Sequence, residues 1–198
     1  MSPIRVETAG LRMNEILFYG LTSRSCFRPQ RSLGVRWRAE FILPRISSLA
    51  SKRLVSKFSL GCWALHTTKQ FANQDCGLLT LSDGRVIASY CWAHPGFFRY
   101  PFMAAQDLQV GKVFTHPDYR GNGLAAAGVS ELVHRCTRPG RTIWYLTSKE
   151  NPASIRVAEK LGFELRGRGG IRARWGTQAL GGYEINIAEP PSRSHLAG

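Results

Sequence analysis

The feature that most limits what this chain can fold into is the segment from Val113 to Ala125, VFTHPDYRGNGLA. An extended apolar stretch ends near Pro117, because proline cannot donate to a strand ladder, and a glycine-containing loop then leads into a helix predicted over 123–136. The first N–H groups of a helix lack intrahelical acceptors, and the helix dipole favours negative charge there. Gly121 and the glycine at 123 let a phosphate approach the backbone, with Arg120 as a nearby cation. The segment therefore predicts a pyrophosphate site at a strand-to-helix junction.

Taken alone, this loop does not identify a ligand. It lacks the Gly-Lys-Ser/Thr ending of nucleotide-hydrolysing loops, and its glycines do not have the spacing of the dinucleotide-binding pattern. Two glycines before a helix also occur in an ordinary tight turn. The rest of the chain is needed to decide between these readings.

Alternating strand and helix patterns predict a mixed α/β fold. Asp83-Gly84 between the apolar runs 78–81 and 86–92 predicts a hairpin, and Gly111 inside the extended stretch 107–115 predicts a bulge or a close backbone approach. The other expected strands are 16–19, 143–146, 163–168 and 183–187, and the other expected helices are 46–58 and one that begins at Asn151-Pro152 and ends at Leu161. This alternation predicts an α/β layer with a mixed sheet.

The chain carries a large and uneven positive charge. Its 27 Lys and Arg residues against 13 Asp and Glu residues give a formal net charge of +14. Residues 1–60 alone carry 11 basic and 3 acidic side chains, a net charge of +8. Such a balance favours anionic partners, whether phosphates, nucleic acid or acidic lipid. The stretch 21–60 also has the composition of an organelle transit peptide, although Glu7 and Glu15 favour a basic part of the domain instead.

Composition and length bound the remaining possibilities. The 198 residues predict a single domain over 1–188, of which 1–60 is the basic part, followed by a disordered tail at 189–198. Five dispersed cysteines and five histidines without ligand spacing predict no disulfide framework and no metal site. No apolar run is long enough to span a membrane, and no secretory signal is visible. We expect a cytoplasmic location; the oligomeric state cannot be inferred.

Two segments together resemble a known family. Arg120–Ala125, RGNGLA, matches the Arg/Gln-x-x-Gly-x-Gly/Ala loop of the GCN5-related N-acetyltransferases (GNAT superfamily). Asn151–Phe163, NPASIRVAEKLGF, resembles that superfamily's second signature, Asn-x-x-Ser/Ala followed by Lys-x-Gly-Phe. The resemblance is strong over 77–163. It implies a mixed, mostly antiparallel central sheet flanked by helices, in which a splayed strand pair forms an acyl-CoA cleft.

The resemblance also implies a reaction and a binding site. The reaction is transfer of an acetyl group from acetyl-CoA to a primary amine of a small acceptor, by direct attack without a covalent enzyme intermediate. The positive charge favours an anionic acceptor. The pantetheine arm would lie along the strand, and the pyrophosphate on the loop. The implied acyl-CoA-binding residues are Val113, Phe114, Thr115, Arg120, Gly121, Asn122, Gly123, Leu124, Ala125, Ala126 and Asn151.

The chain departs from the superfamily at two positions that concern catalysis. Ala158 stands where many members have a proton-donating Tyr, and Leu146 stands where some have a Glu base. Ser154, Asn151 and His116 are therefore the candidate catalytic residues, with Ser154 as the nearest hydroxyl in the motif. A helix-terminal hydrogen bond is an equally favoured role for Ser154.

Alternatives remain open for the base and for the function. His94 and Asp107 are further candidate bases, since each is expected at a strand end near the cleft, and a water chain could serve instead. The two departures leave a non-catalytic acyl-CoA-binding or interaction module with the same fold as the alternative function. Nucleic-acid binding through the basic first third is a less favoured one.

Two further segments invite sharper interpretations. Arg166–Arg174, RGRGGIRAR, is similar to an Arg-Gly RNA-binding tract, but we expect it as a basic hairpin loop or substrate-binding edge between the last two strands. The cluster Phe97–Tyr100 is expected to contribute mainly to core packing, with stacking against an acceptor as the alternative.

Overall fold

The computed structural model describes residues 15–22, 27–29, 36–44, 57–174 and 177–187. Its strands are β1 (Ile16–Leu21), β2 (Arg38–Ile42), β3 (Gly77–Ser82), β4 (Ile87–Pro95), β5 (Leu108–Thr115), β6 (Ile143–Ser148), β7 (Glu164–Arg174) and β8 (Thr177–Ile187). Its helices are α2 (Lys57–Thr67), α3 (Leu124–Cys136), α4 (Pro152–Lys160) and the short 3₁₀ helix η1 (Pro117–Tyr119).

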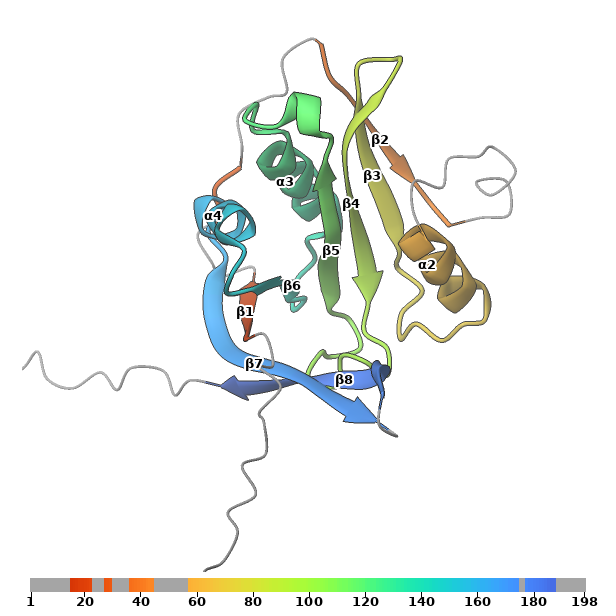
Figure 1. Ribbon diagram of the computed structural model, residues 1–198. Coiled ribbons are helices and arrows are strands. Elements are labelled where there is room, and N and C mark those ends of the chain that lie inside the picture. Colours follow the sequence, from red (N-terminus) through yellow and green to blue (C-terminus); the bar gives the residue numbers. More distant parts are fainter. Residues whose placement is uncertain (1–14, 23–26, 30–35, 45–56, 175–176, 188–198) are drawn as a thin grey trace, which may run out of the picture.

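The strands form one sheet in the order β2-β3-β4-β5-β6-β1-β7-β8. β5 and β6 are parallel, and every other neighbouring pair is antiparallel. Figure 1 shows β3, β4 and β5 side by side between α2 and α3, with α4 next to β6. The expected mixed, mostly antiparallel sheet flanked by helices is confirmed.

The sheet opens into a fork between its two parallel strands. β5 and β6 pair only over Leu108–Val110 and Ile143–Tyr145. β4 holds β5, and β1 holds β6, along the rest of their lengths. The predicted irregularity near Gly111 is a bulge, where two residues of β5 face one residue of β4 and Lys112 has a φ of 46°. Both strands therefore continue past their shared segment with unpaired inner edges.

Alternating side chains build a core on each face of the sheet. Leu79 and Leu81 belong to the large cluster beneath α3 and α4, whereas Leu78 and Trp92 belong to a smaller cluster that includes Cys62 of α2. Successive strand residues point to opposite faces, so one strand contributes to both cores. We refer to the two faces as the α3/α4 face and the α2 face.

Helices α3 and α4 begin and end close to where the sequence predicts, whereas α2 lies largely beyond the helix expected at 46–58 and was not predicted. In α3, Gly128 brings the helix close to Leu81, because a Cβ there would lie 3.5 Å from Leu81 Cδ1. In α4, the Asn151 side chain accepts a hydrogen bond from the Ser154 N–H at 3.1 Å, and Pro152 occupies the first turn. Gly162, with a φ of 85°, then ends the helix.

Other predicted elements need correction. β2 was not expected from the sequence, and β7 and β8 are longer than the strands predicted at 163–168 and 183–187. The prediction of a loop at Arg166–Arg174 is wrong, since this tract is part of β7. Its glycines permit close contact with β8, because a Cβ on Gly169 would collide with the Glu184 carbonyl. Most of the helix expected at 46–58, and the tail at 189–198, lie outside the described residues.

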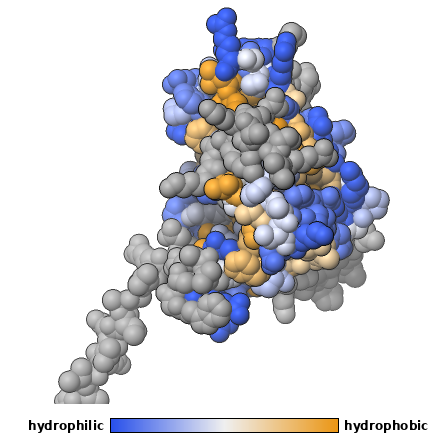
Figure 2. Space-filling model, turned by 90° about the vertical axis from the view of Figure 1, so that its right-hand side faces the viewer, coloured by the Kyte–Doolittle hydropathy of each residue, from blue (hydrophilic) through white to orange (hydrophobic). Residues whose placement is uncertain are grey.

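Viewed from the α2 side, most of the coloured surface is hydrophilic, and small hydrophobic groups lie between the hydrophilic ones (Figure 2). Within the described parts of the chain, no helix is long and apolar enough to cross a bilayer, and no group of three or more His, Cys, Asp or Glu side chains is arranged to bind a metal ion. The four described cysteines are buried free thiols.

Candidate active site

A large cavity of about 670 Å³ lies at the fork on the α3/α4 face. Its walls are formed by β5, the loop before α3, and α4, together with Tyr145 of β6. It is lined by Val113, Phe114, Thr115, Tyr119, Arg120, Gly121, Gly123, Leu124, Ala125, Ala126, Tyr145, Asn151, Ala153, Ser154, Arg156, Val157 and Lys160. The structure thus brings together the predicted acyl-CoA-binding residues, apart from Asn122, with Ser154.

The loop before α3 exposes backbone donors to this cavity. Gly121 and Gly123 have φ angles of 82° and 73°, a left-handed conformation that glycine adopts without a Cβ penalty. Gly123 supplies no side-chain cap, and the N–H of Ala127 bonds to the Gly123 carbonyl at 3.0 Å. The N–H groups of the preceding first turn are thus left for an outside acceptor. Asn122 braces the loop instead, since its Nδ2 donates to the Tyr119 and Arg120 carbonyls.

Three cations surround the large cavity. Arg120 follows η1, and Arg156 and Lys160 are one turn apart on α4. The described lining contains no carboxylate. The positive end of α3 adds to this field, so the cavity is suited to a polyanion. The sequence analysis missed Arg156 and Lys160, although their i, i+4 spacing inside the second signature was visible.

A pair of hydroxyl groups lies deeper in the same cavity. Tyr145 Oη of β6 and Ser154 Oγ of α4 are 2.8 Å apart. Tyr145 is 2% exposed, and its ring packs near Phe163 at a centroid distance of 5.6 Å. Burial raises the pKa of the Tyr145 phenol, while its hydrogen bond with Ser154 acts in the opposite direction. Tyr145 is a site residue that the sequence analysis did not single out.

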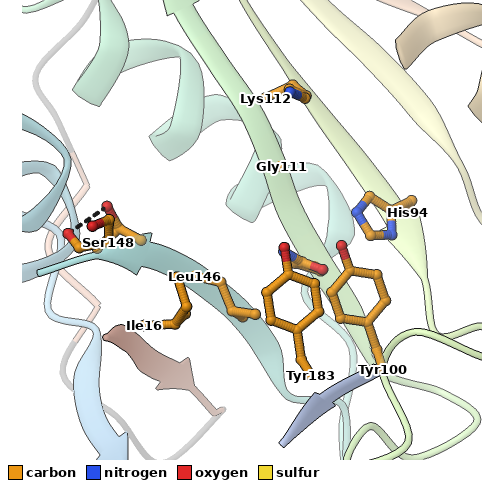
Figure 3. A pocket seen from close by; sticks show the side chains of 10 residues that line it. Ile16, His94, Tyr100, Gly111, Lys112, Leu146, Ser148 and Tyr183 are labelled. Atoms are coloured by element: carbon orange, nitrogen blue, oxygen red, sulfur yellow. Dashed lines mark hydrogen bonds between the residues drawn. The ribbon is translucent and has the colours of Figure 1, made fainter. Parts of the chain in front are cut away.

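A small cavity of about 220 Å³ lies at the same fork on the α2 face (Figure 3). It is lined by Ile16, His94, Tyr100, Gln109, Gly111, Lys112, Leu146, Thr147, Ser148 and Tyr183. Leu146 directly follows Tyr145 in β6, so adjacent residues of one strand line the two cavities. The fork therefore separates a large cationic cavity from a small one with a different lining.

Aromatic and neutral polar groups dominate the small cavity. Tyr100 and Tyr183 stack with centroids 5.1 Å apart and an interplanar angle of 5°, and their hydroxyls point the same way in Figure 3. Arg99 lies over the Tyr183 ring at 5.5 Å. Gln109 is 5% exposed, and its Oε1 has no hydrogen-bond partner in the described structure. This oxygen is a buried acceptor beside the cavity. Phe97, by contrast, packs in the core around Phe71, as expected.

The structure separates the three candidate bases. Burial lowers the pKa of His94 to about 4, and its ring lines the small cavity. Asp107 is 4% exposed and accepts hydrogen bonds from the backbone N–H groups of residues 104 and 142 and from the indole of Trp144. His116 lines neither cavity; its Nδ1 accepts from the Asp118 N–H at the start of η1.

Comparison with known proteins matches this architecture to one family. The sequence matches the GNAT acetyltransferase family over residues 37–168, two thirds of the chain. No curated protein matches it. Among solved structures, the fold is similar to a GCN5-related N-acetyltransferase from Sphaerobacter thermophilus (TM-score 0.53, 19% identity, covering 79% of this chain and 50% of that one).

A second similar structure is an acetyltransferase assigned to the GNAT family from Novosphingobium aromaticivorans (TM-score 0.50, 16% identity, covering 80% of this chain and 62% of that one). This chain therefore spans between half and about three fifths of the length of these two relatives. At these identities the structural similarity concerns the fold alone. Together with the family match, it shows that the chain belongs to the GNAT acetyltransferase family.

Proposed function

We propose that the protein transfers an acetyl group from acetyl-CoA to the primary amine of a small acceptor. The observation that carries the proposal is the pair of cavities on the two faces of one strand fork. Acyl transfer needs the thioester and the amine to meet from different directions at one carbonyl carbon. A fork with a cavity on each face provides that arrangement.

The large cavity is proposed to bind acetyl-CoA. Its glycine loop offers backbone N–H groups at the N-terminus of α3, where a pyrophosphate is stabilised. Arg120, Arg156 and Lys160 supply the matching positive charge. Val113, Phe114 and Thr115 would run beside the pantetheine arm, and Asn151 would lie near the far end of the donor. The cavity volume falls within the range of about 300–1,000 Å³ that is usual for ligand sites.

The small cavity is proposed to receive the acceptor amine. Gln109 Oε1 is a suitable acceptor for an amine N–H, because a buried oxygen gains from each hydrogen bond it receives. Lys112 lines the small cavity, and the described residues that line this cavity include no Asp or Glu. These features support an uncharged or anionic acceptor over a polycationic one. The small volume fits a compact acceptor or one end of a larger molecule.

The reaction would proceed by direct attack. The neutral amine attacks the thioester carbonyl, a strand N–H near Phe114 or Thr115 stabilises the oxyanion, and CoA leaves as a thiolate. Holding both reactants at the fork supplies much of the rate acceleration. Water is proposed to take the proton from the amine, since Asp107 is occupied by three donors and His94 is a weak base.

Thiol release from acetyl-CoA, measured with a panel of amines, tests this function. The panel should contain amino acids, amino-sugar phosphates, arylalkylamines and polyamines. We expect CoA to form with at least one uncharged or anionic amine and the acetylated amine to appear in equal amount by mass spectrometry. Tight binding of acetyl-CoA without turnover of any amine would instead favour the non-catalytic acyl-CoA-binding module.

A further inference from the structure

The contact between Tyr145 and Ser154 joins two elements of the large cavity. Tyr145 is on β6, and Ser154 is in the first turn of α4; their hydroxyl oxygens are 2.8 Å apart. Both side chains line the large cavity together with Val113, Phe114 and Thr115 of β5. This hydrogen bond therefore fixes a hydroxyl group close to the fork itself.

Chemistry favours one direction for this hydrogen bond. A phenol is a stronger acid than an aliphatic alcohol, and so the better donor. Burial keeps the Tyr145 phenol protonated, because it raises the phenol pKa further from neutrality. When Tyr145 donates to Ser154 Oγ, the hydroxyl hydrogen of Ser154 remains available to another acceptor. Ser154 is partly exposed, so its hydrogen can point into the cavity.

The position one turn further along α4 offers Ser154 no hydrogen-bond partner. Ala158 is one turn beyond Ser154, so the two residues lie on the same side of α4. Ala158 is fully buried in the cluster that also contains Tyr145 and Phe163. Its methyl group carries no donor, whereas the ring of Tyr145 reaches this region from β6. The hydrogen-bond partner of Ser154 is thus supplied from the adjacent strand.

We infer that Tyr145 is a positioning residue that orients the Ser154 hydroxyl to donate a hydrogen bond to the thiolate sulfur of the departing CoA. The inference rests on the proposed function, since it requires CoA in the large cavity. In this step the amine nitrogen forms a bond to the carbonyl carbon, and the carbon–sulfur bond breaks with its electron pair going to sulfur. The proton lost by nitrogen goes to water. Ser154 stabilises the thiolate without transferring its proton.

The thiol pKa of bound CoA tests this role without turnover. Thiolate absorbance is titrated with pH for CoA bound to the wild-type protein and to the variants Tyr145→Phe and Ser154→Ala. A hydrogen bond to the thiolate lowers the thiol pKa, and we expect a shift of about one unit, tenfold in acidity. Both variants should return the thiol to its pKa in free CoA. Ser154→Thr, which keeps a hydroxyl, should retain the shift.

Steady-state kinetics then tests the coupling of the two hydroxyls. With a productive amine, each single variant should lower kcat about tenfold while KM for acetyl-CoA changes less than about twofold. The double variant should be no slower than either single one, because both substitutions remove the same interaction. Tyr19→Phe is the matched control: Tyr19 is buried and its hydroxyl bonds to Glu159 of α4 at 3.3 Å, outside the cavity. It should leave kcat unchanged.

The outcomes separate the two proposals. An unshifted thiol pKa in wild-type complex, or a shift that survives in Tyr145→Phe, would overturn the positioning role even if acetyl transfer is observed. A lowered thiol pKa that both variants abolish, with no turnover of any amine, would support the positioning role and overturn the proposed acetyl transfer. Multiplicative losses of kcat in the double variant would also contradict the inferred coupling.

Discussion

Replacing Gly123 by Glu should weaken acetyl-CoA binding about 100-fold. The substitution places a carboxylate at the N-terminus of α3, among three cations and where Gly123 provides no side-chain cap. At about 6 Å and an effective dielectric constant of about 40, repulsion costs about 1.4 kcal/mol for each phosphate charge, or about 3 kcal/mol for a pyrophosphate. Left-handed backbone strain costs a further ~1–2 kcal/mol of folding stability. That strain is present in the free and bound protein, so it does not affect the dissociation constant.

Gly84→Glu provides the matched control for this change. Gly84 has a φ of 92° in the β3–β4 turn, and its Cβ position is open. The Gly84→Glu variant should lose a similar amount of unfolding free energy in chemical denaturation and keep the wild-type dissociation constant for acetyl-CoA. Calorimetric titration with acetyl-CoA measures both variants. Wild-type affinity in Gly123→Glu, or an equal loss in Gly84→Glu, would refute the assignment of the loop as the pyrophosphate site.

Three further predictions follow from the described charges. Arg156→Ala and Lys160→Ala should each weaken acetyl-CoA binding about two- to fivefold at low salt, less at high salt, whereas Arg135→Ala should not; calorimetry at two ionic strengths checks this. The pKa of His94 falls from 6.5 to about 4 on folding, so the unfolding free energy of the wild type should decrease by up to about 3 kcal/mol as the pH drops from 6.5 to 4. In urea titrations, the unfolding free energy of His94→Gln should depend less on pH. Asp107→Asn should cost about 2–3 kcal/mol of unfolding free energy, since an amide cannot accept from all three donors; a wild-type urea midpoint would contradict this.

Features that depend on a few neighbouring residues could be predicted from the sequence. The hairpin at Asp83-Gly84 forms because the Asp83 side chain accepts hydrogen bonds from the N–H groups of Arg85 and Val86. The cap at Asn151 is equally local. The left-handed glycines and the uncapped helix start of the loop before α3 also follow from a few neighbouring residues. Such local signals do not depend on the contacts that the rest of the chain makes.

Elements that depend on distant partners were missed or misread. β2 is an edge strand with three exposed residues, and it pairs with β3, some forty positions further along the chain. No local hydrophobic pattern marks it. The Arg-Gly tract has a loop-like composition, yet Gly167 and Gly169 are extended because the β8 backbone lies against them. Only the tertiary pairing turns these glycines into strand residues.

The candidate site also has a part that could be predicted from the sequence and a part that could not. The loop proposed to bind acyl-CoA was predicted because it is contiguous, but Tyr145 and Ser154 meet across a strand-to-helix connection. The small cavity draws Tyr100, Gln109 and Tyr183 from a loop and two strands that are far apart in sequence. Tyr100 belongs to the cluster Phe97–Tyr100, for which stacking against an acceptor was the alternative to core packing, whereas Gln109 and Tyr183 have no local pattern that indicates a site. The roles of Gln109 and Tyr183 could be proposed only after the fork had been located.

The fork gives β6 a double role that connects these findings. Tyr145 belongs to the α3/α4 face, and Leu146 lines the cavity on the α2 face, so one peptide bond separates the proposed donor and acceptor sides. β1 pairs with β6 along its full length and fixes both side chains at once. A change that loosens β1 or β6 should therefore disturb both sides together, whereas a side-chain change at either position acts on one. We therefore expect side-chain substitutions on β6 to affect the donor side and the acceptor side separately in kinetic measurements.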